Sequence, residues 1–306
     1  MPPDPPAPWP SEQTAHGGAR LLQSQAQCPF QAFARFRLGA EPLAAFQPGG
    51  DGRFRGTLVH AALQRWGERL KNGTPLPAAA APEAHTLAEL CADEAVDALV
   101  RLRPDLLPPL YARMERERLK KLLLAWISLE NQRPPGFQVA ACEEKSSIAL
   151  AGLRLEVRQD RVDRLPGGGL AILDYKTSSA KPSTNNWEGD RPKEPQLPLY
   201  AVTTPQPTAA LAFAHLAAAG PKLIGSSRDE EALPGVPCSK EPWHERQEAW
   251  KASLESLAQR FLAGDAAVDP LKYACGFCGL DPLCRIDRTP SAEDGEETSA
   301  DEGESP

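Results

Sequence analysis

Two neighbouring segments bring two carboxylates and a lysine into one predicted β-hairpin. Residues 153–158 alternate apolar with charged side chains, and the apolar run 170–176 follows a Pro-Gly-Gly-Gly turn at 166–169. This is the pattern of two antiparallel strands joined by a turn. If the hairpin turns about its glycines, Asp160 lies opposite Asp174. Directly opposed like charges destabilise a strand pair unless a cation lies between them.

The chemistry that this pair predicts is metal-assisted. Asp174 and Lys176 are two residues apart on one strand, so both side chains project from the same face. Carboxylate oxygens suit Mg²⁺ or Mn²⁺, which also accept phosphate oxygens. A nearby ammonium can stabilise the charge that develops on a phosphate. Each aspartate taken alone would more simply be an exposed strand residue paired with Arg158, Arg161 or Lys176.

Four short motifs, in this order along the chain, resemble those of the RecB-type branch of the PD-(D/E)XK nucleases. They are Arg55-Gly56-Thr57-Leu58-Val59-His60, Arg158-Gln159-Asp160-Arg161-Val162-Asp163, Ile172-Leu173-Asp174-Tyr175-Lys176-Thr177 and Glu194-Pro195-Gln196-Leu197-Pro198-Leu199-Tyr200. The resemblance implies an α/β fold with a restriction-endonuclease-like core, in which a mixed central sheet is flanked by helices and carries helical insertions.

The resemblance also implies roles for particular residues. The implied metal ligands are His60, Asp160, Asp174 and the backbone carbonyl of Tyr175. Lys176 takes the place of the catalytic lysine. Gln196 and Tyr200 match a Gln-x-x-x-Tyr motif that supports the site and contacts DNA, and their i,i+4 spacing places them on one helix face.

Two features bear on how closely the chain follows that pattern. Val157 stands where the family often has a glycine ahead of the first motif aspartate, although no ligand is lost. The family also tends to have a glutamate on the preceding strand, and here Glu143 and Glu144 are adjacent. Because side chains alternate along a strand, only one of the two can face the site. The sequence leaves open which one does.

Four of the seven cysteines have the spacing of a metal-binding set. Cys275, Cys278 and Cys284 follow a Cys-x2-Cys-x5-Cys pattern, and Cys28 lies far upstream. Four thiolates suit a [4Fe–4S] cluster or a structural zinc ion, and spacing alone leaves both open. The arrangement resembles the iron–sulfur staple of AddB-type members of this branch. It implies a cluster that ties the N- and C-terminal parts of the domain together.

The remaining pattern predicts one α/β domain over residues 19–286. Helices are predicted at 56–71, 87–103, 110–131 and 242–262, a linker at 72–86, a short helix opened by Pro195, and a strand at 209–216. The Pro-rich segment 1–18 and the acidic segment 287–306 are predicted to be disordered, because neither can bury enough apolar surface to offset the entropy lost on ordering.

The net charge of −7 does not exclude a DNA partner. Eight of the 41 acidic residues and one of the 34 basic residues lie in the last twenty positions, so the rest of the chain is electrically balanced. The basic loop between 178 and 193, which carries Lys181, Trp187, Arg191 and Lys193, is a candidate DNA-contacting surface or a solvated loop. We expect a cytoplasmic protein without membrane contact, because no apolar run reaches the roughly 18–20 residues of a membrane helix and the N-terminus does not resemble a signal peptide.

These observations predict a Mg²⁺- or Mn²⁺-dependent deoxyribonuclease. An exonuclease that processes DNA ends in repair or recombination beside a helicase partner is implied by the resemblance. A CRISPR-associated exonuclease that trims spacer precursors is an alternative with the same site residues and an iron–sulfur cluster. A non-catalytic DNA-binding or scaffold subunit of a helicase complex is a third reading. It is disfavoured because degenerate members usually lose an acid or the lysine, and Asp160, Asp174 and Lys176 are all present.

Overall fold

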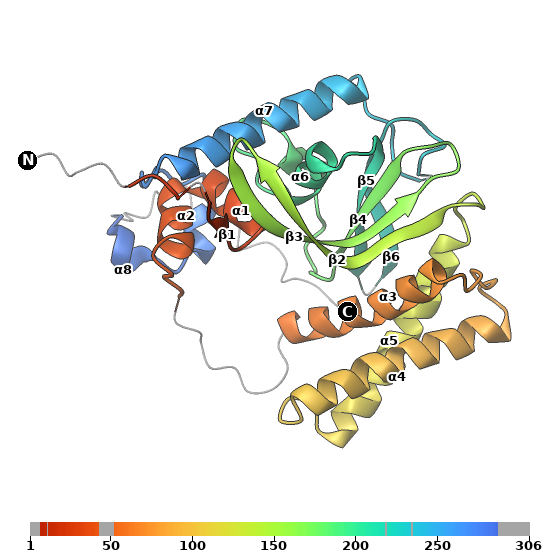
Figure 1. Ribbon diagram of the computed structural model, residues 1–306. Helices are drawn as coiled ribbons and strands as arrows, with labels where there is room; N and C mark the ends of the chain where they lie inside the picture. Colours follow the sequence, from red (N-terminus) through yellow and green to blue (C-terminus); the bar gives the residue numbers. More distant parts are fainter. Residues whose placement is uncertain (1–6, 11, 43–51, 218, 234, 287–306) are drawn as a thin grey trace, which may run out of the picture.

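A computed structural model describes residues 7–10, 12–42, 52–217, 219–233 and 235–286. Across these residues the chain forms a six-stranded mixed sheet with helices on both faces (Figure 1). The predicted α/β architecture, a mixed sheet flanked by helices, is thereby confirmed. The predicted acidic tail at 287–306 lies outside the described residues. Among the helices that are described, none combines the length and the apolar character needed to cross a bilayer.

The sheet has the order β1-β3-β4-β5-β6, and β2 pairs with β3 as well. Its strands are β1 (Thr14–Ala15), β2 (Gln138–Leu150), β3 (Leu153–Arg164), β4 (Leu170–Lys176), β5 (Thr208–Ala217) and β6 (Gly220–Ser227). The β1/β3 and β4/β5 pairs are parallel, and the others are antiparallel. A parallel pair needs a crossover connection, and between β4 and β5 this connection contains the helix that carries Gln196 and Tyr200.

The β3/β4 hairpin has the register predicted from its glycine turn. The ladder pairs Arg161 with Leu173 and ends there, and one step further in the same register Asp160 lies opposite Asp174. The turn closes through a hydrogen bond from the Leu165 N–H to the carbonyl of Gly169, at 3.1 Å. The position of the turn in the sequence therefore sets which side chains meet across the two strands.

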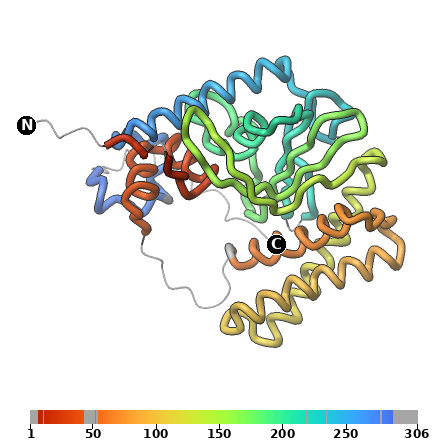
Figure 2. The backbone as a smooth tube through the Cα atoms, viewed as in Figure 1, coloured from red at the N-terminus to blue at the C-terminus, as the bar shows by residue number. Residues whose placement is uncertain are grey.

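The helices form two layers that lie on opposite faces of the sheet (Figure 2). One layer contains α3 (Gly52–Lys71), α4 (Pro82–Leu102) and α5 (Pro109–Glu130), and the other contains α1 (Ala19–Gln27), α6 (Gln196–Thr203) and α7 (Trp243–Leu262). The shorter helices are α2 (Pro29–Phe36), α8 (Asp281–Cys284), and two 3-10 turns at Thr184–Trp187 and Ala274–Phe277. Tyr175 packs in the core on the α3–α5 side, whereas Ile172 packs on the α6–α7 side.

Three boundaries differ from the predictions. α4 begins at Pro82, within the predicted linker, because proline is well suited to the first helical turn, where its missing N–H leaves no hydrogen bond unmade. α3 begins at Gly52 rather than Gly56. Thr14 and Ala15 lie in the segment predicted to be disordered, yet they form β1 and pair with β3.

A buried ion cluster fixes β3 to the α3–α5 layer. The fully buried Arg161 lies 2.8 Å from Oε1 of Glu130, and its Nε donates to Asp163 at 2.8 Å. Arg133 donates to the other oxygen of Asp163 at 2.7 Å, and Trp66 donates to Glu130 at 3.1 Å. Two arginines and two carboxylates balance one another, which buried charges require. The cluster holds β3 in place directly beside the first motif aspartate.

Candidate active site

Three carboxylates lie side by side across β2, β3 and β4. The β2/β3 ladder pairs Glu144 with Gln159, so Glu143 lies opposite Asp160. The β3/β4 register places Asp160 opposite Asp174. The exposed fractions of the side chains are 5% for Glu143, 8% for Asp160 and 4% for Asp174. Three acids in one buried row repel one another, so the arrangement calls for a cation.

Of the two adjacent glutamates, Glu143 enters the site. Its carboxylate lies 3.1 Å from Nδ1 of His60, whereas Glu144 pairs with Lys71 at 3.3 Å and its side chain is 59% exposed. Glu143 also has a φ of 49°. A left-handed φ is uncommon for a residue with a Cβ, costs about 1–3 kcal/mol, and is concentrated at functional sites.

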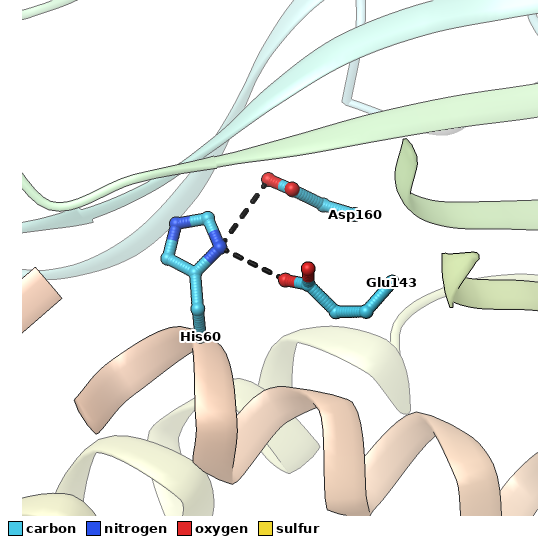
Figure 3. Close-up of side chains that lie close together, drawn as sticks. All are labelled: His60, Glu143 and Asp160. Carbon is cyan, nitrogen blue, oxygen red and sulfur yellow. Dashed lines mark hydrogen bonds and ion pairs between the residues drawn. The ribbon is translucent and has the colours of Figure 1, made fainter. Parts of the chain in front are cut away.

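His60 reaches the carboxylates from α3, as Figure 3 shows. Its Nδ1 lies 3.1 Å from Oε1 of Glu143 and 3.6 Å from Oδ2 of Asp160. Its Nε2 lies 3.1 Å from the carbonyl oxygen of Tyr175. In the described parts of the chain, His60, Glu143 and Asp160 are the one group of three His, Cys, Asp or Glu residues whose possible ligand atoms lie within 4.8 Å of one another.

The hydrogen-bond chemistry of His60 shows that these residues fit a cation. A carbonyl oxygen can only accept, so the ring nitrogen facing Tyr175 carries its hydrogen and donates it. In the neutral ring the other nitrogen, Nδ1, is then an acceptor, and it faces two carboxylates that are also acceptors. A proton or a metal ion must lie among these three groups. Histidine nitrogen and carboxylate oxygen are ordinary ligands of divalent metals.

The pKa values of the site follow from the burial of these carboxylates and their closeness to one another. Burial, and then the charge of Asp174, raise the pKa of Asp160 to about 7. Burial alone would lower the pKa of His60, but its hydrogen bond with Glu143 and the charges of Asp160, Glu143 and Asp174 raise it. These shifts favour a proton among the acids of the metal-free protein at and below neutral pH, and a bound metal would displace it.

Asp174 is held by two neighbours. Its Oδ1 accepts a hydrogen bond from Nε2 of Gln196 at 2.6 Å, and its Oδ2 lies 2.7 Å from Nζ of Lys176. Burial alone would lower the pKa of Lys176, but the charge of Asp174 raises it, so the ammonium stays protonated. The lysine therefore brings a fixed positive charge to the edge of the carboxylate row.

The Gln-x-x-x-Tyr motif on α6 has two separate contacts. Gln196 touches a carboxylate directly, as above, whereas the hydroxyl of Tyr200 donates to the backbone carbonyl of Arg158 at 2.9 Å. Tyr200 thus fixes β3 two residues before Asp160, and it holds the strand rather than a ligand. The two residues lie on one helix and orient two neighbouring strands of the site.

The backbone of Tyr175 links the first aspartate to the histidine. Its N–H donates to Oδ2 of Asp160 at 2.8 Å, and its carbonyl accepts from His60. The N–H bond takes the place of a ladder bond beyond the end of the β3/β4 pairing. The carbonyl predicted to be a metal ligand therefore lies against Nε2 of His60, on the opposite side of the ring from the carboxylates.

α3 approaches the end of β4 closely at Gly56. A Cβ added there would lie 3.1 Å from Oγ1 of Thr177, which is tighter than ordinary contacts, so a residue without a side chain fits best. A hollow of about 410 Å³ opens beside this contact. Its walls are formed by Gly56, Thr57, His60, Ala61, Gln64, Glu143 and Arg158.

Arg158 is a site residue to which the sequence motif assigns no role. Its Nε lies 2.9 Å from Oε2 of Glu143, and its side chain is 59% exposed. It is two residues from Asp160 on β3, and strand alternation was the signal that could have placed both on one side.

The basic loop after β4 is only partly a free surface. Trp187 is fully buried and packs against Phe213 and Trp250. Arg191 donates to the carbonyls of Ala26 and Gln27 and to the carboxylate of Asp269. Both residues are structural, which corrects the expectation that they form part of a DNA-contacting surface. Lys181 and Lys193 are exposed.

The segments that carry the four spaced cysteines are neighbours in space. Cys28 caps the N-terminus of α2. The Phe30 N–H donates to the carbonyl of Ala267 at 2.9 Å, and Arg35 donates to the carbonyl of Cys278 at 2.8 Å. Over the residues that the structure covers, no three of the thiols come within 4.8 Å of one another. A bound cluster or zinc ion therefore stays a prediction.

Comparison with known proteins identifies the family. The model of the PD-(D/E)XK nuclease superfamily matches residues 20–285 of the chain. No curated protein matches it. Among solved structures, the crystal structure of SSO0001 aligns with 86% of this chain and 93% of its own, at 13% sequence identity. The TM-score of that alignment is 0.31.

Proposed function

The chain belongs to the PD-(D/E)XK nuclease superfamily, and from that premise we propose that it is a deoxyribonuclease that hydrolyses phosphodiester bonds with Mg²⁺ or Mn²⁺. The single observation that carries this proposal is the buried row of Glu143, Asp160 and Asp174, with Nδ1 of His60 facing two of its members. The row is costly without a cation, and its donor set is suited to a divalent one.

The chain supplies the groups that this reaction needs. His60, Glu143 and Asp160, whose ligand atoms lie within 4.8 Å of one another, would hold the metal together with the neighbouring Asp174. The Tyr175 carbonyl, a further ligand by the resemblance, lies on the Nε2 side of His60 and orients the ring. When bound, a divalent metal supplies a water of lowered pKa and neutralises charge on the phosphate.

Two further side chains orient the reacting groups. The ammonium of Lys176 is placed to stabilise charge on the phosphate and to orient the attacking water. Gln196 fixes the rotamer of Asp174 through its 2.6 Å hydrogen bond to Oδ1, and the other carboxylate oxygen, Oδ2, faces the ammonium of Lys176.

The finer parts of the proposal rest on the resemblance of the four motifs. By that resemblance, the protein would act as an exonuclease on single strands or DNA ends. It would function in DNA repair or recombination together with a helicase partner. The presence of all the acids together with Lys176 supports catalysis over a scaffold role.

The four spaced cysteines would hold a [4Fe–4S] cluster, which is supported by the packing of the 267–278 segment on α1 and α2. Iron and acid-labile sulfide per chain, measured in anaerobically purified protein, test that part.

Cleavage of end-labelled single- and double-stranded DNA by anaerobically purified protein tests the activity. We expect cutting with Mg²⁺ or Mn²⁺, none with EDTA, and a loss of at least about 100-fold in Lys176→Ala, since preorganised charge at a phosphate is worth several kcal/mol. Lys251→Ala, which removes an exposed lysine from α7, is the matched control. Equal rates in wild type and Lys176→Ala would reject the site, and the product ladder would distinguish exonuclease from endonuclease action.

A further inference from the structure

Two cations lie directly opposite each other beside the carboxylate row. The β2/β3 ladder pairs Lys145 with Arg158, two residues along each strand from Glu143 and Asp160. Paired residues of an antiparallel ladder have side chains on the same face, about 4.5–5.5 Å apart, and like charges in these positions destabilise the pair. The facing carboxylates of Asp160 and Asp174 indicate a bound cation. For the same reason, the facing cations Lys145 and Arg158 indicate a bound anion.

The surroundings of this cation pair leave it free to bind. Both residues are exposed. Lys145 has no ion pair among the described residues, and Arg158 has one, through Nε to Glu143 at 2.9 Å. An arginine has five N–H donors in a planar fork, so most of the guanidinium remains available for an oxyanion. The hydroxyl of Tyr200 holds the backbone of Arg158 at 2.9 Å, which keeps the position of the side chain defined.

The hollow beside His60 connects the cation pair to the carboxylates. Arg158 lines it together with His60 and Glu143, and its volume of about 410 Å³ lies within the range of about 300–1,000 Å³ typical of ligand sites. None of its lining residues is Phe, Tyr or Trp, so no large aromatic ring in the hollow selects a base by stacking. Recognition by charge, independent of sequence, fits this lining.

We propose that Lys145 and Arg158 bind the DNA phosphate next to the scissile one, with the nucleoside between the two phosphates in the hollow beside His60. This inference rests on the proposed nuclease function and adds the path of the substrate strand. Lys176 lies at the β4 end of the carboxylate row and the cation pair lies at the β2/β3 end. Each of the three cations lies two residues further from the hairpin turn than the carboxylate on its own strand. The DNA strand therefore runs alongside the carboxylate row, and the scissile phosphate lies between Lys176 and the cation pair.

The test compares Lys145→Ala, Arg158→Ala and the double variant with wild type and with the exposed control Lys251→Ala. Binding to a labelled oligonucleotide is measured with Ca²⁺ in place of the active metal over a series of salt concentrations, and kcat and KM are measured with Mn²⁺. We expect each single variant to raise Kd and KM about tenfold and to lower the salt slope by about 0.7–0.9, the value for one phosphate contact. For Lys145→Ala, which touches no carboxylate, the effect falls on KM rather than on kcat.

The possible outcomes separate this inference from the function on which it rests. If wild type cleaves DNA and the double variant keeps the Kd, KM and salt slope of wild type, the cation pair does not bind substrate and the inference is wrong. If Arg158→Ala loses kcat while Lys145→Ala has no effect, Arg158 acts only by positioning Glu143, which also overturns it. If wild type binds but does not cleave, the proposed function fails, and the salt slopes alone still decide whether the pair contacts a phosphate.

Discussion

At the scale of single residues, the sequence predicted which chemical groups form the site. It did not predict which way their side chains point. Glu143 and Glu144 carry the same carboxylate, so the sequence could not choose between them. The β2/β3 register and the left-handed backbone at Glu143 make the choice. The ion pair of Arg158 with Glu143 could not be predicted either, because it depends on how β2 and β3 are paired, and no sequence motif specifies that register.

Asp160→Asn should stabilise the metal-free protein at alkaline pH. The folded-state pKa of Asp160 is about 7 and its unfolded value is about 3.9, so wild type loses stability as pH rises from about 4 to 7. The amide stays neutral and its oxygen still accepts the Tyr175 N–H. We expect an advantage of about 1–4 kcal/mol at pH 8, which disappears near pH 4.

Thermal unfolding in EDTA across this pH range, with and without added Mn²⁺, measures the effect. Mn²⁺ should raise the Tm of wild type and leave that of Asp160→Asn almost unchanged, because the variant lacks a charged ligand. A variant that is less stable than wild type at pH 8 in EDTA would show that Asp160 is not under electrostatic strain.

At the scale of elements, the β3/β4 hairpin was predictable because a glycine turn fixes its register locally. The start of α4 was not, since Pro82 is compatible with both a linker and a first helical turn. The burial of Trp187 and the bonds of Arg191 were also beyond prediction, because the same composition serves a solvated loop. The placement of α3 against β2 depends on contacts between residues about 75 positions apart, such as Gly67 and Cys142.

Gly67→Ala should test how α3 docks on β2. A Cβ on Gly67 would overlap Sγ of Cys142, while it would lie 3.6 Å from the Cβ of that residue. We expect Gly67→Ala to destabilise the protein by about 1–3 kcal/mol through overpacking. Removing the sulfur in Cys142→Ala should restore most of that loss, and chemical denaturation of the four proteins of this double-mutant cycle measures the coupling. Additive effects would mean that the helix and strand do not meet at this point.

At the scale of the whole molecule, the sheet separates two hydrophobic cores, and the site lies where β3 and β4 stop pairing. At that point α3 supplies the histidine from one helical layer and α6 supplies the glutamine from the other. The four motifs span about 145 residues of sequence, so only the resemblance predicted that they would meet. The hollow and the Lys145–Arg158 pair could not be predicted, since they arise from the assembled strands and helix together.

The most direct measurement is a calorimetric titration of Mn²⁺ into metal-free wild type, Glu143→Gln and Glu144→Gln. The two variants remove the same charge from adjacent residues, but only Glu143 faces His60. We expect Glu143→Gln to weaken Mn²⁺ binding by at least about tenfold, because loss of even an outer-shell partner of a metal ligand costs about 10–100-fold in affinity, and Glu144→Gln to bind within twofold of wild type. Equal affinities in all three proteins, or a loss confined to Glu144→Gln, would contradict the metal site on which the nuclease account depends.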